Sequence, residues 1–342
     1  MIIFLFADFK IGGSQKIAVE IFNELIKKKS DIIALSISNK GDLKKKIKKK
    51  NIYSLGYNRL IVSIFKLYTF LKDKKPTQIF CTQPHLGIII FFLNFFLSKK
   101  VKIIVRETNT SKFNNFFDIS FKKRCENLLK LIIFNFVSIV VFPSKNISYK
   151  LNTRSVIIPN FVDLQEIEYA KKKNIKNFIL GMGRLSKQKG FDTLIKAFIN
   201  VKNKISHNLL IVGEGEEYPY LMRIIKENKV QNRVKILNFT DKPYSYIKGC
   251  SLFILSSRWE GMPNILIQAL ASKANILSTD CMFGPKEILK SGKLGHLCKV
   301  ENVNEMSKKI LFALKYKKKI SYIDYSQYDK KIIIKKYLKL FI

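Results

Sequence analysis

The sequence contains little histidine, and its cysteines are scattered. Histidine occurs only at His85, His207 and His296, and none of the five cysteines forms a C-x-x-C pair. Structural zinc sites are built from closely spaced Cys and His ligands. We therefore expect no structural zinc site, and scattered thiols are typical of a reducing compartment.

Long hydrophobic runs and a signal peptide are also missing. The longest apolar runs, Leu86–Leu97 and Leu131–Phe142, are shorter than the roughly 20 residues that span a bilayer. Met1 leads straight into Ile2–Phe6, without the basic start and small-residue cleavage site of a secretory signal. These features predict a cytoplasmic protein. We expect both runs to form buried helices or strands, and the alternative for Leu86–Leu97 is a helix in a membrane interface.

Acidic residues are few, because the chain has 63 Lys and Arg but only 25 Asp and Glu, a formal net charge of +38. Many lysines occur in solvated runs such as Lys44–Lys50, which indicates drift in composition as the main cause. The alternative is a surface that binds polyanions. In both cases we expect attraction to an anionic bilayer, at about 1 kcal/mol per well-placed cation. No helix-turn-helix, zinc-finger or RNA-recognition pattern is present, so we expect no nucleic-acid partner.

The first half of the chain alternates between short apolar runs and helical patterns. It opens with the apolar run Ile2–Phe6, after which Gly12 and Gly13 lead to Ser14, a candidate N-cap for a helix. A continuous apolar run is typical of a parallel strand covered on both faces. Further strands are expected at Asp31–Ile37, Ile79–Cys81, Val101–Val105 and Ile139–Val141. This βαβ rhythm predicts a doubly wound parallel sheet.

A break at Val156–Asp163 and a lysine-rich polar stretch up to Asn177 separate this half from a second one. There the rhythm restarts, with strands expected at Phe178–Gly181, Leu209–Val212, Val234–Leu237, Leu252–Leu255 and Asn275–Ser278. The sequence therefore predicts an α/β fold of two Rossmann-like domains, 1–160 and 161–322. A helix in 323–342 should pack back towards the first domain. Because ligands of open parallel sheets bind at the carboxyl ends of the strands, we expect a site in a crevice between the domains.

Two glycine loops follow predicted strands and open predicted helices. At Gly12–Ser14, free backbone amides and the positive end of a helix dipole suit an anion. At Gly181–Arg184, the guanidinium can grip phosphate oxygens, and Lys189 adds a mobile charge, so a diphosphate is the simplest ligand. This second loop is neither a dinucleotide fingerprint nor a P-loop. The plain alternative for both loops is a glycine turn next to solvated side chains.

A third segment, SSRWEGMPNILIQ, follows the expected strand Leu252–Leu255. It carries Glu260 on a loop, and a helix begins at Pro263 or Asn264, with its amides facing the crevice beside Glu260. A loop carboxylate can bind sugar hydroxyls, and Gln268 on the helix can reach ribose hydroxyls.

Five segments, in this order, resemble the family 4 glycosyltransferases, which are retaining enzymes of GT-B architecture and include the group 1 transferases of bacterial surface glycans. Each motif alone is weak, but five in order are specific. The segments are Pro159–Asp163, Gly181–Phe198, Ile211–Glu217, Ser256–Leu270 and Ser278–Leu289.

The resemblance implies a catalytic role for three residues. Arg184 and Lys189 would hold the donor diphosphate, and Glu260 would bind the transferred sugar. It also implies retaining transfer without a metal or other cofactor, in which these cations and helix N-termini stabilise the leaving diphosphate. The remaining donor contacts are expected from Gly183, Glu214, Phe239, Pro263, Asn264 and Ile265.

One position departs from the family pattern. Such enzymes usually carry a second Glu in an E-x7-E motif with the first, but here that position is Gln268. A hydrogen bond to a charged group contributes about 1.5–3 kcal/mol, against about 1 kcal/mol for a neutral one. We therefore expect weaker ribose binding rather than loss of the chemistry.

The first domain should receive the acceptor. The residues expected on this side are the loop Gly12–Ser14 together with His85, Arg106, Glu107 and Asn109, the last four of which each follow a predicted strand. Each has a plain alternative as a loop contact or a cap.

Taken together, the sequence predicts a retaining glycosyltransferase that moves a hexose or N-acetylhexosamine from a nucleotide diphosphate-sugar. The resemblance to the family implies uridine as the base of the donor. The expected acceptor is a lipid-linked saccharide of bacterial surface glycan assembly, at the inner face of the cytoplasmic membrane. The alternatives are an inactive scaffold of the same fold, suggested by Gln268, and a sugar-nucleotide epimerase that needs no acceptor.

Overall fold

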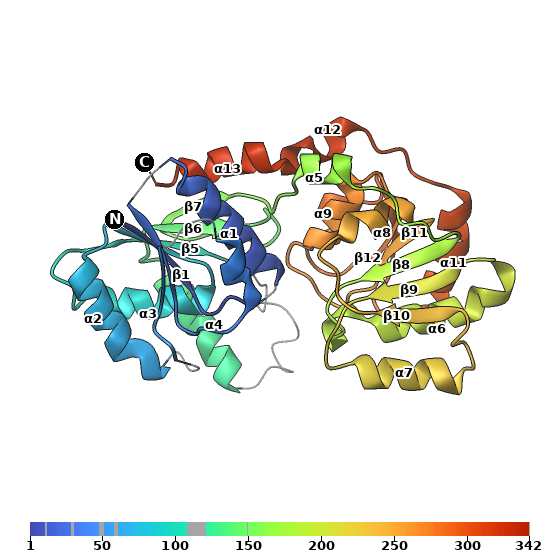
Figure 1. Cartoon of the computed structure of the whole chain (residues 1–342), viewed down its shortest axis with the longest axis horizontal. Coiled ribbons are helices and arrows are strands. Elements are labelled where there is room, and N and C mark those ends of the chain that lie inside the picture. Colours follow the sequence, from blue (N-terminus) through green and yellow to red (C-terminus); the bar gives the residue numbers. More distant parts are fainter. Residues whose placement is uncertain are drawn as a thin grey trace. The chain divides into compact units, whose positions relative to one another are not determined.

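The computed structural model describes residues 1–10, 12–28, 31–47, 51–57, 61–107, 121–148 and 150–341, without the side chains of 121–126. The chain forms two compact units, Met1–Asn160 with Ile333–Ile342, and Phe161–Ile332. Each unit is built on one parallel sheet with helices on its faces (Figure 1).

The first unit contains a seven-stranded sheet whose strands are all parallel. In spatial order the strands are β3 (Ile52–Ser54), β2 (Ile32–Ser36), β1 (Ile2–Phe6), β4 (Gln78–Cys81), β5 (Lys102–Arg106), β6 (Ile139–Phe142) and β7 (Arg154–Ile157). The five interior strands β2, β1, β4, β5 and β6 are mostly apolar and almost entirely buried. The sequence did not predict β3 and β7, because these edge strands are short and partly exposed and lack a continuous apolar run.

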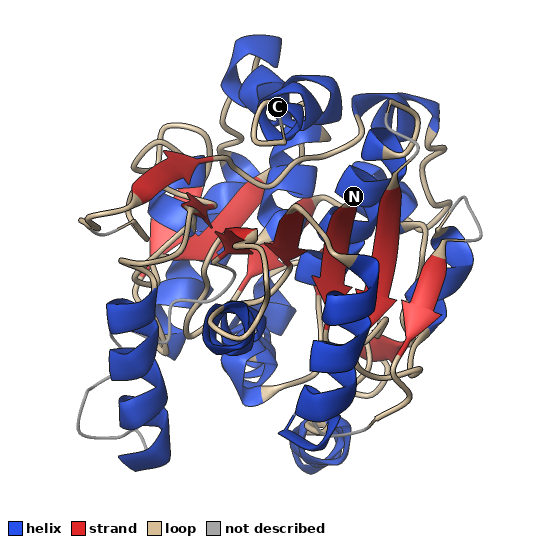
Figure 2. Ribbon diagram, turned by 90° about the vertical axis from the view of Figure 1, so that its left-hand side faces the viewer, coloured by secondary structure: helices blue, strands red, loops and turns tan. Residues whose placement is uncertain are grey.

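Helices cover both faces of this sheet (Figures 1 and 2). They are α1 (Gly13–Leu25), α2 (Ile64–Lys74), α3 (Pro84–Asn94), α4 (Phe121–Ile133) and α13 (Lys330–Leu338). Figure 1 shows α2, α3 and α4 on one side, and α1 and α13 on the other, as right-handed crossovers on either side of β1 require. The predicted N-cap at Ser14 is wrong: Gly12 is the N-cap of α1, and Ser14 lies in the first turn.

The second unit contains a six-stranded parallel sheet. In spatial order its strands are β10 (Val234–Leu237), β9 (Asn208–Val212), β8 (Phe178–Met182), β11 (Leu252–Leu255), β12 (Ile276–Thr279) and β13 (His296–Cys298). Buried apolar side chains form two cores. Its helices are α5 (Leu164–Tyr169), α6 (Phe191–Val201), α7 (Tyr218–Glu227), α8 (Pro243–Gly249), α9 (Asn264–Ala271), α10 (Pro285–Ile288), α11 (Val303–Lys315) and α12 (Tyr322–Tyr325).

The chain passes between the units twice, after Asn160 and after Ile332. Close to these two points, Val162 pairs with Asp329 in a parallel bridge, and its carbonyl accepts a hydrogen bond from the amide of Lys330. The closing helix α13 is therefore shorter than the sequence suggested, because the residues before it form α12 and a 3-10 turn of the second unit.

None of the helices in the described parts of the chain has both the length and the apolar composition of a membrane span.

Candidate active site

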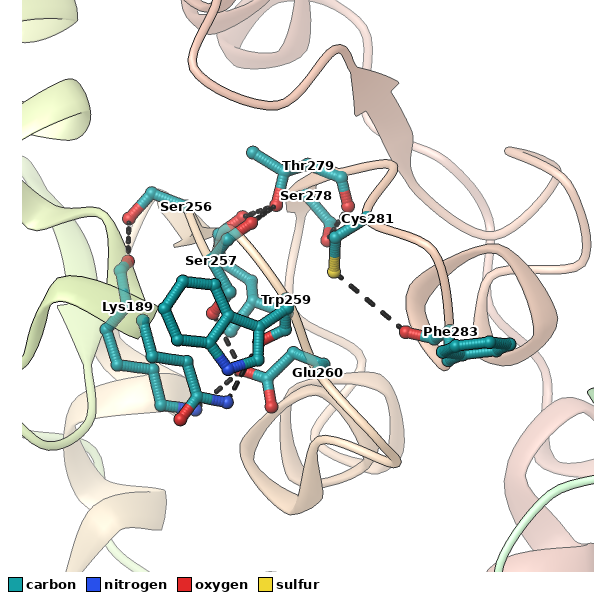
Figure 3. Close-up of polar contacts among 11 residues, drawn as sticks. Lys189, Ser256, Ser257, Trp259, Glu260, Ser278, Thr279, Cys281 and Phe283 are labelled. Carbon is teal, nitrogen blue, oxygen red and sulfur yellow. Dashed lines mark hydrogen bonds and ion pairs between the residues drawn. The ribbon is translucent and has the colours of Figure 1, made fainter. Parts of the chain in front are cut away.

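Three loops gather at the carboxyl edge of the second unit's sheet, after β8, β11 and β12 (Figure 3). This arrangement follows from the parallel strands, since their carboxyl ends share one edge. The loop after β8 contains Lys189, the loop after β11 contains Glu260, and the loop after β12 contains Cys281. Residues that lie 71 positions apart in the chain thereby become neighbours.

An ion pair joins the first two loops. Lys189 Nζ lies 2.5 Å from Glu260 Oε1, and the same oxygen accepts a hydrogen bond of 2.7 Å from Ser257 Oγ. Figure 3 shows both groups directed at the Glu260 carboxylate. The Glu260 side chain is only 6% exposed, against 18% for Lys189. The carboxylate is therefore held in a fixed position, while the ammonium group keeps access to solvent.

Backbone contacts hold these two loops close together. Ser256 Oγ donates to the Lys189 carbonyl at 2.8 Å, and Gln188 Nε2 donates to the Trp259 carbonyl at 2.9 Å. Gly190 has a left-handed backbone with φ of 61°, and a Cβ there would lie 2.2 Å from the Ser256 carbonyl oxygen. Only glycine satisfies both requirements.

Arg258 links the same loops to each other through its guanidinium group. Its guanidinium binds Asp192 at 2.7 Å, Glu301 at 2.5 Å and the Lys187 carbonyl at 2.7 Å. Burial alone would raise the pKa of the Asp192 carboxyl, but the Arg258 hydrogen bond and charge lower it below its usual range. Sequence reasoning did not single out this pair, because the two residues are 66 positions apart and only the fold brings them together.

Cys281 lies next to the ion pair, but its thiol has low reactivity. Burial, together with the charge of Glu260, raises the pKa of its thiol to about 12. The neutral thiol is a weak nucleophile near neutral pH. The neighbouring Thr279 supports the loop instead, since its Oγ1 donates to the Ser257 carbonyl at 2.6 Å.

The helix α9 directs its N-terminus to the same edge. Pro263 is its N-cap, and Leu266 and Ile267 donate their amides to the Pro263 carbonyl. The amides of Asn264 and Ile265, like the first amides of any helix, have no carbonyl partner within the helix. Among the described residues, the buried Asn264 Oδ1 also lacks a hydrogen-bond partner.

The other residues predicted on the donor side lie in loops of the same unit. Arg184 is exposed, and among the described residues its guanidinium has no hydrogen-bond or ion-pair partner. Gly183 packs against the Lys189 stem, since a Cβ there would lie 3.4 Å from Lys189 Cε. Glu214 accepts a hydrogen bond of 3.2 Å from the Phe239 amide, and the Phe239 ring is 50% exposed. Gln268 is half-buried on α9, one turn after Asn264.

The loops that carry this site lie in a stretch of the chain that matches a known sequence family. Residues 165–331 match the family model for glycosyl transferases, group 1. The N-terminal unit lies outside this match.

Two relatives illustrate what this chain is similar to. A stretch of 153 residues is 35% identical to the Campylobacter jejuni N-acetylgalactosamine-N,N'-diacetylbacillosaminyl-diphospho-undecaprenol 4-alpha-N-acetylgalactosaminyltransferase, and covers 44% of this chain and 41% of that enzyme. An uncharacterized glycosyltransferase of Haemophilus influenzae is 27% identical over 308 residues, 87% of this chain and 85% of that protein. The chain spans about two fifths of the length of the curated relatives that it matches at 33% and 35% identity.

Solved structures confirm the fold class of two parallel-sheet, Rossmann-like domains of GT-B type. The crystal structure of Anabaena Alr3699/HepE in complex with UDP-glucose has a TM-score of 0.80, at 16% identity, over 99% of this chain and 98% of that one. At this identity the likeness concerns the fold.

Two residues expected on the acceptor side are buried, so they cannot line an open edge. Arg106 is 2% exposed and donates to Tyr337 Oη, to Ser14 Oγ and to Asn160 Oδ1, at 3.1, 3.2 and 2.5 Å. Glu107 is 1% exposed and forms an ion pair of 2.9 Å with Lys130. The strand end after β5 is thus a structural junction of the first unit, and Asn109 lies outside the described residues.

His85, in contrast, is exposed at the start of α3 and lines a cavity of about 260 Å³ in the first unit. The cavity lies at the carboxyl ends of β1 and β2 and beside the start of α3. Its other lining residues are Ala7, Asp8, Lys10, Ile37, Ser38, Lys40 and Tyr57. Gly12 and Gly13 lie at the start of α1 and are not part of this lining.

Among the described residues, no three His, Cys, Asp or Glu side chains are grouped as a metal site would require.

Proposed function

We propose that this protein is a retaining glycosyltransferase that moves a hexose or N-acetylhexosamine from a UDP-sugar to a lipid-linked saccharide. The observation that carries the proposal is the fixed Lys189–Glu260 pair, on loops within the stretch that matches the group 1 family. The pair combines a cation that keeps access to solvent with a buried carboxylate. The cation can bind the diphosphate of a donor, and the carboxylate can bind the hydroxyls of its sugar.

The donor diphosphate would bind to three kinds of positive group. Arg184 is exposed and can bind two phosphate oxygens at once. Lys189 adds a point charge, and the amides of Asn264 and Ile265 add the N-terminus of α9. As the diphosphate leaves, these groups would stabilise its growing charge. We propose that they meet this need without a metal ion or other cofactor.

The donor sugar would bind to Glu260. In the structure Lys189 neutralises this carboxylate at 2.5 Å. An incoming diphosphate would attract the ammonium, so that Glu260 oxygens become free to accept from sugar hydroxyls. Ser257 Oγ would keep the carboxylate in place during this exchange. The unpartnered Asn264 Oδ1 is a further acceptor for a ligand group beside α9.

The nucleoside would bind at the outer end of the same edge. The half-exposed Phe239 ring offers a surface for the base, beside the Gly183 loop, and Glu214 fixes the backbone that carries the ring. Gln268 would accept from the ribose hydroxyls through a neutral side chain.

The transfer step follows from these positions. The acceptor hydroxyl would attack the anomeric carbon on the side from which the diphosphate leaves. The new C–O bond forms as the bond to the diphosphate breaks, and the departing phosphate oxygen takes the hydroxyl proton. A covalent intermediate on Cys281 is not required, and its neutral thiol is poorly suited to one.

The acceptor would bind to the first unit. The name of the Campylobacter relative, with which this chain shares 35% identity over 153 residues, describes a diphospho-undecaprenol acceptor, which favours a lipid-linked saccharide here too. The cavity beside His85 and the Gly12–Ser14 loop are the candidate contacts. We propose surface polysaccharide or related glycan assembly at the inner face of the cytoplasmic membrane, with the anionic bilayer as a partner.

A donor panel tests this function. Purified protein is incubated with UDP-, GDP- and ADP-sugars, with and without EDTA and with a membrane lipid extract, and the anomeric configuration of the product is read by NMR. Transfer from one UDP-sugar, with retention and in the presence of EDTA, is expected. Conversion of the donor to an epimer without an acceptor would establish an epimerase. Absence of binding to any donor would establish an inactive scaffold.

A further inference from the structure

The helix α3 is apolar around almost its whole circumference, although only one side of it is covered. Its sequence, PHLGIIIFFLN, carries His85 and Asn94 as its only polar residues. One side packs on the sheet, where a Cβ on Gly87 would lie 2.5 Å from a methyl of Val105. On the outer side, Phe92 is 47% exposed. A surface helix of a soluble domain normally has a polar outer side, and the apolar outer side of α3 departs from this pattern.

The exposed apolar surface extends beyond α3. Phe95 and Phe96 follow the helix with exposures of 61% and 72%, and Phe136 follows α4 with 68%. Phe91 joins them, since its ring centroid lies 5.1 Å from that of Phe95 and 6.1 Å from that of Phe136. We call this surface the phenylalanine face; it consists of Phe91, Phe92, Phe95, Phe96 and Phe136, with the exposed Leu128 and Ile132 of α4 beside them. Isolated exposed apolar side chains are normal, but a contiguous group of this kind marks an interaction site.

The phenylalanine face is bordered by positive charge. Residues 61–100, which contain α2 and α3, carry six lysines and a single acidic residue, Asp73. Lys99 and Lys100 lie three and four residues after Phe96, and Lys100 Nζ lies 5.1 Å from the centroid of Phe95. Phenylalanine on the apolar side and lysine at its border are typical of protein surfaces that lie in the headgroup region of an anionic bilayer.

We propose that the phenylalanine face is the surface by which this protein docks on an anionic membrane. The rings would enter the boundary between headgroups and acyl chains, and Lys99 and Lys100 would contact lipid phosphates. The described part of α2 lies on the same side of the sheet and would add Lys66 and Lys72 to the contact (Figure 1).

Charge argues against a second copy of the chain as the partner. A two-fold dimer brings the same surface patch of both subunits together. Two phenylalanine faces would therefore bring two lysine borders against each other, and like charges without intervening anions repel. An anionic lipid surface removes this repulsion and covers the rings.

This inference rests on the proposed function in one respect: a lipid-linked acceptor would require the protein to reach a membrane. The phenylalanine face itself consists of residues of the first unit alone. Vesicle binding and UDP binding are therefore measured separately. Loss of one without the other shows which of the two proposals has failed.

The test is co-sedimentation of the full chain with vesicles of phosphatidylcholine, with and without phosphatidylglycerol, at low and high salt. Two variants remove the proposed contacts, Phe95→Ser/Phe96→Ser and Lys99→Gln/Lys100→Gln. Two matched controls change exposed residues of the second unit, Tyr169→Ser/Tyr220→Ser and Lys226→Gln/Lys235→Gln.

Wild type and both controls should bind anionic vesicles tightly at low salt and more weakly, but still measurably, at high salt. The Phe variant should lose about tenfold or more in binding at both salt concentrations, and the Lys variant should lose binding to anionic vesicles mainly at low salt. All variants should bind UDP as wild type does. Equal vesicle binding by the Phe variant and its control, or absence of binding by wild type, would overturn the proposal. A wild-type dimer that the Phe variant converts to monomer would assign the face to self-association instead.

Discussion

The two units of this protein differ in how their functional surfaces are built. In the second unit, charged side chains pair across loops at short distances, as Lys189 does with Glu260 and Arg258 with Asp192. In the first unit, the two charged residues expected to be functional, Arg106 and Glu107, are buried, and the exposed phenylalanine face is bordered by lysine.

This difference is consistent with the two functions that we propose for the two units. Chemistry on a sugar diphosphate needs charges held in position before the ligand arrives, because preorganised groups cost little rearrangement during the reaction. Binding to a lipid surface needs exposed apolar area and positive charge but no fixed geometry. The second unit meets the first requirement, and the first unit meets the second.

The largest effect is expected from removing the charge of Glu260. In Glu260→Gln the amide cannot accept two charge-assisted hydrogen bonds from the donor sugar, and Lys189 loses its anionic partner. We expect kcat/KM for sugar transfer to fall roughly 100- to 1,000-fold, as for other preorganised charges. Steady-state assays with the preferred donor measure this. The control is Glu227→Gln, an exposed change on α7; equal activity of the two variants would mean that the chemistry is elsewhere.

A second prediction concerns the clamp behind the site. Arg258→Gln leaves Asp192 without its cation, and both side chains are 13% exposed. Breaking a buried pair costs about 3–5 kcal/mol, so we expect the free energy of unfolding to fall by roughly 2–4 kcal/mol here. UDP affinity should fall as well, because the clamp positions the loop that carries Lys189. Urea denaturation and calorimetry measure the two effects.

The outer partner of Arg258 provides the matched control. Glu301 is 58% exposed, and Glu301→Gln should cost less than about 1 kcal/mol and leave UDP affinity unchanged. A loss as large as that of Arg258→Gln would contradict the assignment of the clamp to Asp192.

The smallest effect is expected at Gln268. Gln268→Glu replaces a neutral acceptor with a charged one, which adds roughly 0.5–2 kcal/mol to a hydrogen bond with the ribose hydroxyls. Affinity for UDP should rise roughly threefold to thirtyfold, and affinity for inorganic diphosphate should not change. Calorimetry with both ligands makes the comparison. An unchanged UDP affinity would remove Gln268 from the ribose contact.

Much of the fold could be predicted from local patterns. The expected strand Leu252–Leu255 agrees with β11 at both ends, because buried parallel strands are continuous apolar runs. The expected strand Val234–Leu237 also agrees with β10, although this edge strand contains the exposed Lys235. The edge strand β3, Ile-Tyr-Ser, and the short β13 were missed, because neither carries such a run. The sequence predicted that α9 begins at Pro263 or Asn264, and in the structure it begins at Asn264 with Pro263 as its N-cap.

Site residues could be predicted from the sequence where they belong to one contiguous motif. Contacts between residues that are distant in the chain could not be predicted, because only the fold brings them together. Glu260 and Lys189 stood out in the sequence by their loops, although their contact did not. The clamp of Arg258 on Asp192 has no local signal. Arg106 follows an apolar run as a binding residue would, and only the structure shows that Tyr337, from the other end of the chain, covers it.

The central claim is that the loops of the second unit bind a sugar diphosphate through Lys189. Calorimetry of UDP binding to wild type, Lys189→Ala and Lys187→Ala tests it most directly. Lys187 is exposed in the same short turn and is not a member of the ion pair, so it controls for general charge. We expect UDP to bind wild type and Lys187→Ala with similar affinity, and Lys189→Ala at least about tenfold more weakly. Equal affinity of all three proteins, or no UDP binding by any of them, would contradict the account.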